Sequence, residues 1–100
     1  GIVDRFDPSV EDIRIPHVGW NEVYPTRPST LFDGILPGKD FYFVHSYHFC
    51  PSDKADVLAT TPYGAGFVSA VQRDLVFGIQ FHPEKSQRLG FALLKNFLAV

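Results

Sequence analysis

The stretch from Phe41 to Phe49 constrains the fold more than any other part of the chain. It consists largely of aromatic and β-branched residues, which prefer strands. The apolar residues do not alternate strictly with polar ones, and such a pattern is typical of a strand buried on both faces. We therefore predict a central strand in a sheet that is covered on both sides. Aromatic residues make up 15% of the chain, so rings should dominate the core.

Shorter apolar runs separated by turn residues predict several more strands. The segments at 57–61 and 67–71 flank a loop with two glycines, a pattern typical of neighbouring antiparallel strands. The segment 17–21 combines tryptophan with glycine and fits neither a plain strand nor a helix. The other expected strands are 1–6, the alternating stretch of Ile13 and Ile15 before Pro16, and 75–81.

Proline and glycine recur through residues 24–40, so most of this segment is predicted to be loop. One helical turn capped by Ser29 or Thr30 is expected inside it. The end of the chain is predicted to be an amphipathic helix with Ser86 as its N-cap. The apolar residues that recur at helical spacing are Leu89, Leu93, Leu94, Phe97 and Leu98.

Composition excludes several classes of protein. The chain has 100 residues and a net charge of −2, without a run of lysine or arginine, so nucleic acid is not an expected partner. No apolar stretch approaches the roughly 20 residues that cross a bilayer, so no membrane association is expected. The single cysteine, Cys50, forms no internal disulfide and fits a cytoplasmic protein. The chain contains no methionine and opens on Gly1 inside a strand-like run, so we expect that a natural N-terminal part is absent.

The sharpest chemical feature is the sequence His82-Pro83-Glu84, which follows a predicted strand and precedes a predicted helix. Residues two apart in extended backbone point to the same side, so Glu84 can reach the His82 ring. A carboxylate on one imidazole nitrogen fixes the tautomer and leaves the other nitrogen to accept a proton. Spacing alone also fits a structural His-Pro turn with a solvated Glu84, so both interpretations stay open.

A general base needs a nucleophile, and Cys50 is the only thiol. It lies between Phe49 and Pro51, whereas a strand-to-helix nucleophile elbow needs small residues on both sides. We therefore interpret Cys50 as a core thiol at the end of a strand. The four histidines lie on different segments, and His45 and His48 should face opposite sides of one strand, so no metal site is expected.

Three segments together resemble a known family. The sequence Phe-His-Pro-Glu-Lys-Ser at 81–86 resembles the closing motif of the class I, triad-type glutamine amidotransferases. Pro-His-Val-Gly-Trp-Asn at 16–21 and Tyr-Phe-Val-His-Ser-Tyr at 42–47 resemble signatures of one branch, the glutaminase subunits of imidazole glycerol phosphate synthases. The three motifs occur in matching order.

The resemblance implies an α/β fold, the C-terminal part of a three-layer α/β domain with a mixed sheet, antiparallel strands and a C-terminal helix. Residues 1–100 would be the C-terminal portion of a single amidotransferase domain of roughly 200 residues. The family's Gly-x-Cys-x-Gly elbow precedes the segments matched here, so we expect this chain alone to lack glutaminase activity. Without the first half, an apolar sheet face and a strand edge should be exposed. No cofactor is expected.

The resemblance also implies roles for residues. His82 would be the general base and Glu84 its orienter, while a thiolate attacks the glutamine carboxamide and water later releases glutamate. The ammonia would pass to a cyclase subunit, a (β/α)8 barrel that forms imidazole glycerol phosphate and AICAR in histidine biosynthesis. The residues implied to line the glutamine site are His45, Ser46 and Tyr47, and those near the cyclase-docking face are Trp20, Tyr42 and Lys85.

Three alternatives remain beside this interpretation. The chain could belong to the glutaminase of another class I amidotransferase, although Trp20 in its Gly-Trp-Asn setting argues against this. It could be a binding module that kept the scaffold without the chemistry. Finally, it could be a structural α+β domain with a His-Pro turn, if the three motifs coincide by chance.

Overall fold

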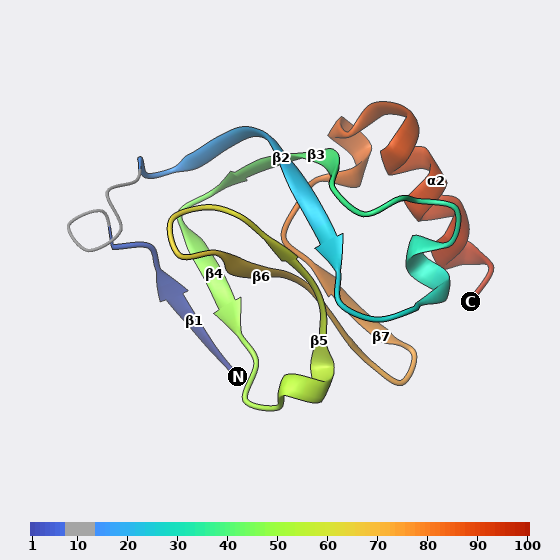
Figure 1. Cartoon of the computed structure of the whole chain (residues 1–100), viewed down its shortest axis with the longest axis horizontal. Helices are drawn as coiled ribbons and strands as arrows, with labels where there is room; N and C mark the ends of the chain where they lie inside the picture. Colours follow the sequence, from blue (N-terminus) through green and yellow to red (C-terminus); the bar gives the residue numbers. More distant parts are fainter. Residues whose placement is uncertain (8–13) are drawn as a thin grey trace.

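The computed structural model describes residues 1–7 and 14–100. The chain forms seven strands, three short 3₁₀ turns and one long helix within these residues (Figure 1). The strands are β1 (Ile2–Arg5), β2 (His17–Pro25), β3 (Lys39–His45), β4 (Tyr47–Cys50), β5 (Val57–Thr61), β6 (Phe67–Arg73) and β7 (Val76–Ile79). The 3₁₀ turns are η1 (Thr30–Phe32), η2 (Lys54–Asp56) and η3 (Pro83–Lys85), and the helix is α2 (Gln87–Leu98).

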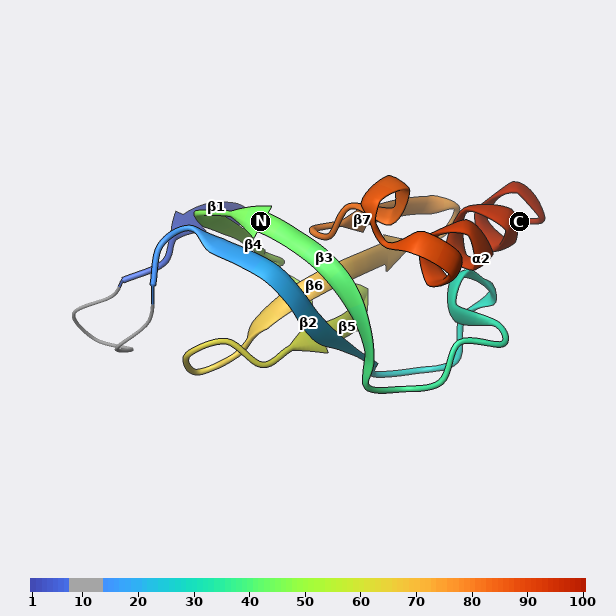
Figure 2. The ribbon, with the colours of Figure 1, turned by 90° about the horizontal axis from the view of Figure 1, so that it is seen from above.

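The strands form two sheets. Five strands pair in the order β3-β2-β5-β6-β7, and β1 pairs with β4 in a separate two-stranded sheet. Every strand pair among the described residues is antiparallel. Helix α2 and the turn η1 lie together at one end of the larger sheet, and β1 and β4 lie at the other end (Figure 2). The antiparallel strands, the hairpin β5–β6 and the terminal helix confirm the corresponding predictions.

The predicted central strand over Phe41 to Phe49 is wrong. Strand β3 is the last strand of its sheet and ends at His45, after which the chain passes through Ser46 into β4 of the other sheet. Burial alternates along β3, with Phe41 and Phe43 fully enclosed and Val44 exposed. The aromatic residues of this stretch are therefore divided between two successive strands, β3 and β4, and do not form one strand that is covered on both faces.

Strand β2 is not predicted as a plain strand by its sequence. It begins at His17 and runs for nine residues, and Gly19 carries a φ of +125°, a conformation that side-chain-bearing residues rarely adopt. This glycine explains why the segment 17–21 fits no simple pattern. Ile15 lies in a bend before β2 and packs against the core. Ile13, predicted to share one strand with Ile15, lies outside the described residues.

The predicted turn inside the loop 24–40 is confirmed as η1. The Ser29 hydroxyl accepts a hydrogen bond from the Leu31 amide at 3.2 Å, which caps the turn. The turn buries Leu31, Phe32 and the following Ile35, so it anchors the loop to the core.

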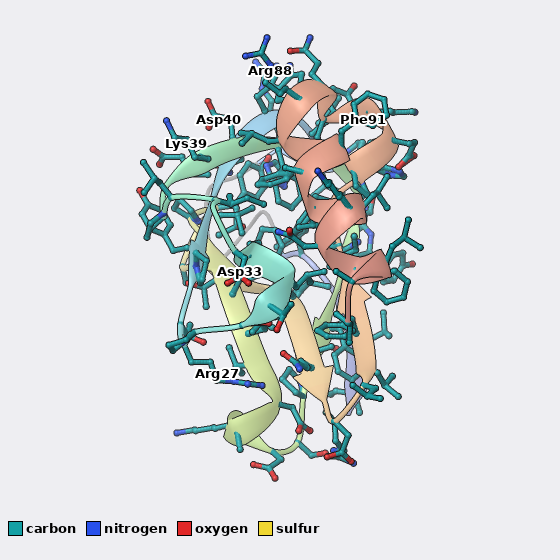
Figure 3. All side chains as sticks on the ribbon, turned by 90° about the vertical axis from the view of Figure 1, so that its right-hand side faces the viewer. Arg27, Asp33, Lys39, Asp40, Arg88 and Phe91 are labelled. Atoms are coloured by element: carbon teal, nitrogen blue, oxygen red, sulfur yellow. The ribbon has the colours of Figure 1, made fainter. Side chains whose placement is uncertain are left out.

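Helix α2 forms where the spacing predicts it, but its apolar face is only partly covered. Leu93 is buried and Leu89 packs against the core, whereas Leu98 is 83% exposed, contrary to the prediction. Phe91 is 76% exposed and lies on the outer side of the helix (Figure 3). The helix therefore carries a second apolar surface that none of the described residues covers. No helix among residues 1–7 and 14–100 has the length and apolar character needed to span a bilayer.

Gly90 sets how closely α2 approaches the turn η3. A Cβ atom at this position would lie 1.8 Å from the carbonyl oxygen of Pro83. Only glycine fits there, because the obstacle is backbone and not a flexible side chain. This close contact holds η3 and the residue before it, His82, against the start of the helix.

Candidate active site

His82 and Glu84 form a pair at the junction between the last strand and the last helix. The chain leaves β7, passes Phe81 in the core, and reaches His82 in an extended conformation before Pro83 opens η3. The Nδ1 atom of His82 lies 3.2 Å from Oε2 of Glu84, as the spacing predicts. Their side chains are 36% and 58% exposed, so the pair is accessible from solvent.

The environment keeps the Glu84 carboxylate ionised. Its own backbone N–H lowers the pKa of Glu84, and the hydrogen bond to the His82 ring acts in the same direction. An ionised carboxylate next to Nδ1 requires the proton of a neutral imidazole to be on Nδ1. No hydrogen bond to the opposite nitrogen, Nε2, is formed by the residues that the structure describes. The pair therefore has the geometry of a general base with its orienting carboxylate.

Ser86 fixes the backbone of His82, and sequence reasoning missed this role. Ser86 is the N-cap residue of α2 by position, as predicted, but its hydroxyl makes no capping hydrogen bond. The hydroxyl instead donates to the His82 carbonyl at 2.6 Å and accepts from the Tyr42 amide at 3.0 Å. The His82 amide donates to the Tyr42 carbonyl at 2.9 Å. The outer edge of β3 at Tyr42 is thus occupied by the segment that carries His82, and we call these hydrogen bonds among Ser86, His82 and Tyr42 the Ser86 clamp.

Three side chains come together on the surface beside the Ser86 clamp, those of Trp20, Tyr42 and Lys85. The rings of Trp20 and Tyr42 pack edge to face with their centroids 5.7 Å apart, and Trp20 and Tyr42 are register partners in β2 and β3. The Nζ atom of Lys85 lies 6.0 Å from the centroid of the Tyr42 ring, at the limit of a cation–π contact. We call these three residues the aromatic–lysine patch. Tyr42 belongs to the patch through its side chain and to the clamp through its backbone.

His45, Ser46 and Tyr47 form the crossing from β3 to β4. The Nδ1 atom of His45 lies 2.7 Å from the carbonyl oxygen of Tyr47, so the imidazole ties the two ends of the crossing together. The Ser46 carbonyl accepts a hydrogen bond from the Phe6 amide at 3.1 Å. The three residues are therefore held as one short ordered segment between the two sheets.

The expectation that His45 and His48 face opposite sides is wrong. Both rings lie against Phe6, at centroid distances of 5.2 Å and 4.8 Å, because the strand breaks at Ser46. His17 joins them, with Nδ1 at 2.9 Å from Nε2 of His45. The described residues include no group of three histidine, cysteine or acidic side chains arranged to hold a metal ion.

Cys50 ends β4, as predicted, but its thiol is half-buried and lies outside the hydrophobic core of the described residues. Its sulfur lies 3.6 Å from Nδ1 of His48, not beside the His82 and Glu84 pair. This placement agrees with the sequence argument that Cys50 is not the nucleophile served by His82.

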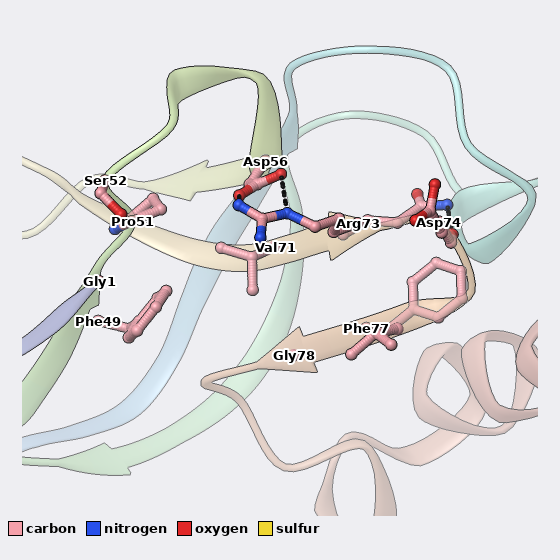
Figure 4. A pocket seen from close by; sticks show the side chains of 12 residues that line it. Gly1, Phe49, Pro51, Ser52, Asp56, Val71, Arg73, Asp74, Phe77 and Gly78 are labelled. Carbon is pink, nitrogen blue, oxygen red and sulfur yellow. Dashed lines mark hydrogen bonds and ion pairs between the residues drawn. The ribbon is translucent and has the colours of Figure 1, made fainter.

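A pocket of about 410 Å³ lies between β4 and β7, over β6 (Figure 4). Phe49, Val71 and Phe77 give it apolar walls, and the ion pair of Arg73 with Asp56 lies at its rim. None of the residues predicted for the site lines this pocket. It is an apolar groove between the two sheets.

Residues 2–100 match the glutamine amidotransferase class-I family, so the chain belongs to this family. Among curated proteins, the imidazole glycerol phosphate synthase subunit HisH of Moorella thermoacetica is 54% identical over 85% of this chain and 40% of its own length. The subunit of the same name from Chromobacterium violaceum is 53% identical over 89% of this chain and 42% of its own length. The chain thus spans less than half the length of these relatives.

A solved structure supports the fold. A GMP synthase-type protein of Thermoplasma acidophilum superposes with a TM-score of 0.75 at 17% identity, over 98% of this chain and 47% of its own. At this identity the likeness establishes the fold only. The α/β class I amidotransferase fold predicted from the sequence is therefore confirmed.

Proposed function

We propose that the protein to which this chain belongs hydrolyses glutamine to glutamate and ammonia as the glutaminase subunit of an imidazole glycerol phosphate synthase. The observation that carries the proposal is the hydrogen bond between His82 and Glu84 at 3.2 Å. This pair stands in a chain that is about half identical to subunits named for that synthase. Such a pair is the part of a triad that a nucleophile requires.

His82 has the role of general base in this proposal. Glu84 accepts the Nδ1–H of the imidazole, so Nε2 presents a lone pair that takes the proton of a cysteine thiol. The thiolate then attacks the carboxamide carbon of glutamine, and the imidazolium returns the proton to the departing ammonia. Water attacks the resulting thioester with the same base assisting, which releases glutamate. The nucleophile is assigned to a segment outside this chain, because Cys50 contacts His48 instead.

The His45–Tyr47 segment is proposed to line the glutamine site, and the aromatic–lysine patch is proposed to face a cyclase subunit. A patch of Trp, Tyr and Lys has the amphipathic rings that are enriched at protein interfaces. Ammonia would pass to that partner, a (β/α)8 barrel, within a heterodimer that forms imidazole glycerol phosphate and AICAR. The free thiol of Cys50 is in keeping with a cytoplasmic enzyme.

The test is glutamate release by the complete protein, with and without a cyclase subunit. We expect His82→Ala to lower kcat/KM by about 10²–10⁴-fold, the usual contribution of a general base. Glu84→Gln should cause a smaller loss, because its carboxylate is 58% exposed and its influence is screened by solvent. Glu22→Gln, a carboxylate elsewhere on the sheet, serves as the matched control and should leave the rate unchanged.

Each outcome separates one alternative. If the complete protein releases no glutamate, the result favours a binding module that retains only the scaffold. Glutamate release without any effect of a cyclase subunit would favour the glutaminase of another class I amidotransferase. Glutamine hydrolysis by the isolated 100-residue chain that depends on His82 would contradict the assignment of the nucleophile to another segment.

A further inference from the structure

The ring of His17 is almost wholly enclosed, yet both of its nitrogens have partners. The residue is 4% exposed and its ring stacks between Phe43 and Tyr63, at centroid distances of 5.0 Å and 3.9 Å. Nδ1 lies 2.9 Å from Nε2 of His45, and Nε2 lies 3.1 Å from Nδ2 of Asn21. Two imidazoles and one amide therefore form a continuous chain of hydrogen bonds inside the protein.

The groups at the two ends fix the direction of this chain. The Tyr47 carbonyl only accepts, so Nδ1 of His45 carries the proton of that 2.7 Å hydrogen bond. Nε2 of a neutral His45 is then an acceptor, and the proton between the two rings belongs to Nδ1 of His17. Nε2 of His17 in turn accepts from the Asn21 amide.

The orientation of the Asn21 amide is fixed independently. Its nitrogen donates to the Pro62 carbonyl at 2.7 Å, and its oxygen accepts from the Glu22 amide at 2.8 Å. A reversed amide would place two acceptors against each other at Pro62 and two donors against each other at Glu22. Both ends of the chain therefore require the same arrangement, with both imidazoles neutral and protonated on Nδ1.

We propose that His17 is a positioning residue that holds His45 in the neutral Nδ1–H tautomer and thereby fixes the carbonyl of Tyr47 and the segment from His45 to Tyr47. The ligand of that segment, glutamine, rests on the proposed function, whereas the hydrogen-bond chain does not. His45 has no free ring nitrogen in this arrangement, so the segment would bind through its backbone and through Ser46 and Tyr47, not through the His45 ring.

The chain of hydrogen bonds through Asn21, His17 and His45 should be intact at neutral pH and should break in acid. His17 faces His45 on β3 and Tyr63 in the β5–β6 loop, and His45 also faces His48 on β4 and His82 after β7. Burial and the charge of His45 lower the pKa of His17 to about 4, and burial also lowers the pKa of His45. A second proton on either ring would set two N–H donors against each other.

The direct test is ¹⁵N NMR of the complete protein labelled at histidine. At pH 7.5 we expect long-range proton–nitrogen correlations that show a protonated Nδ1 and an unprotonated Nε2 for both His17 and His45. A protonated Nε2 on either ring, or an imidazolium at this pH, would overturn the proposal. The ¹³C shift of the Tyr47 carbonyl gives a second readout of the hydrogen bond and needs no enzymatic activity.

Two substitutions separate positioning from packing. His17→Phe keeps a ring between Phe43 and Tyr63 but lacks the donor, whereas His17→Asn places an amide N–H near the position of Nδ1. We expect His17→Phe to change the His45 tautomer, shift the Tyr47 carbonyl resonance and raise KM for glutamine about tenfold with little change in kcat, the effect of one lost hydrogen bond. His17→Asn should partly restore the His45 tautomer, the Tyr47 carbonyl resonance and the KM for glutamine.

His48→Phe is the control, because His48 contacts the same Phe6 ring but lies outside the chain of hydrogen bonds. It should leave the tautomers of His17 and His45 unchanged. Equal effects of His17→Phe and His17→Asn would reduce His17 to a packing residue and overturn the proposal. If His17→Phe fails to fold, the wild-type spectra and His17→Asn still decide the question. A complete protein that shows these NMR signatures but does not hydrolyse glutamine would refute the proposed function alone.

Discussion

Replacing Ser86 with alanine removes one hydroxyl that joins the start of α2, the backbone of His82 and the edge of the sheet at Tyr42. The residue is 2% exposed, so water cannot take the place of the lost group. The His82 carbonyl keeps a second donor, the Lys85 amide at 3.1 Å, whereas the Tyr42 amide loses its acceptor, the Ser86 oxygen. One buried donor is therefore left unpaired, and the free energy of unfolding should fall by about 1–3 kcal/mol.

The assay is denaturation of the complete protein by urea, with Ser52→Ala at an exposed site as the matched control. Activity should fall as well, because the His82 backbone loses the hydrogen bond that aligns it, and small displacements of a base cost about 10–100-fold in kcat/KM. A change in unfolding free energy below about 0.5 kcal/mol, the range of ordinary surface substitutions, would refute the account of Ser86.

Three further predictions concern other contacts. The pKa of His17 is lowered from 6.5 to about 4 in the folded protein, so between these values the unfolded state binds one more proton and the free energy of unfolding should decrease as the pH falls, by about 3 kcal/mol at pH 4. Chemical denaturation between pH 7 and 4 should show this decrease, and His17→Phe should make it smaller. An equal decrease in both proteins would contradict the account. Gly90→Ala should lower the thermal midpoint, because the new methyl group meets the Pro83 carbonyl and overpacking costs about 1–3 kcal/mol; an unchanged midpoint would mean that η3 shifts freely. On the proposal that the aromatic–lysine patch faces a cyclase subunit, Lys85→Ala should weaken binding of that subunit by up to about 1 kcal/mol, the size of an exposed charge contact. Calorimetric titration that finds equal affinities would remove Lys85 from the interface.

Features that depend on neighbouring residues were predictable from the sequence. The His82 and Glu84 pair follows from extended backbone, and the position of α2 follows from the spacing of its leucines. The cap of η1 by Ser29 is equally local. Each of these interactions spans only a few residues, so the sequence contains both partners within one short window.

Features that depend on strand pairing were not predictable. Composition shows that Phe41 to Phe49 prefers extended backbone, but not that β3 lies at an edge, because the edge is set by which strands pair. His17 and His45 are 28 residues apart and meet through the register of β2 with β3. Sequence reasoning assigns Ser86 to its helix because caps are the common role of serine there, whereas its partner Tyr42 lies 44 residues away.

The Ser86 clamp also makes the geometry of the His82 and Glu84 pair depend on the local stability of the segment from η3 to α2. Proteins open in sub-global steps whose free energies lie below that of complete unfolding. When the start of α2 detaches from β3, the hydrogen bonds of His82 to Tyr42 and Ser86 break while the strands can stay paired. On the proposed function, the fraction of molecules in which His82 is correctly placed therefore depends on this local opening equilibrium, and a partner bound over Tyr42 and Lys85 would increase that fraction by holding the segment closed.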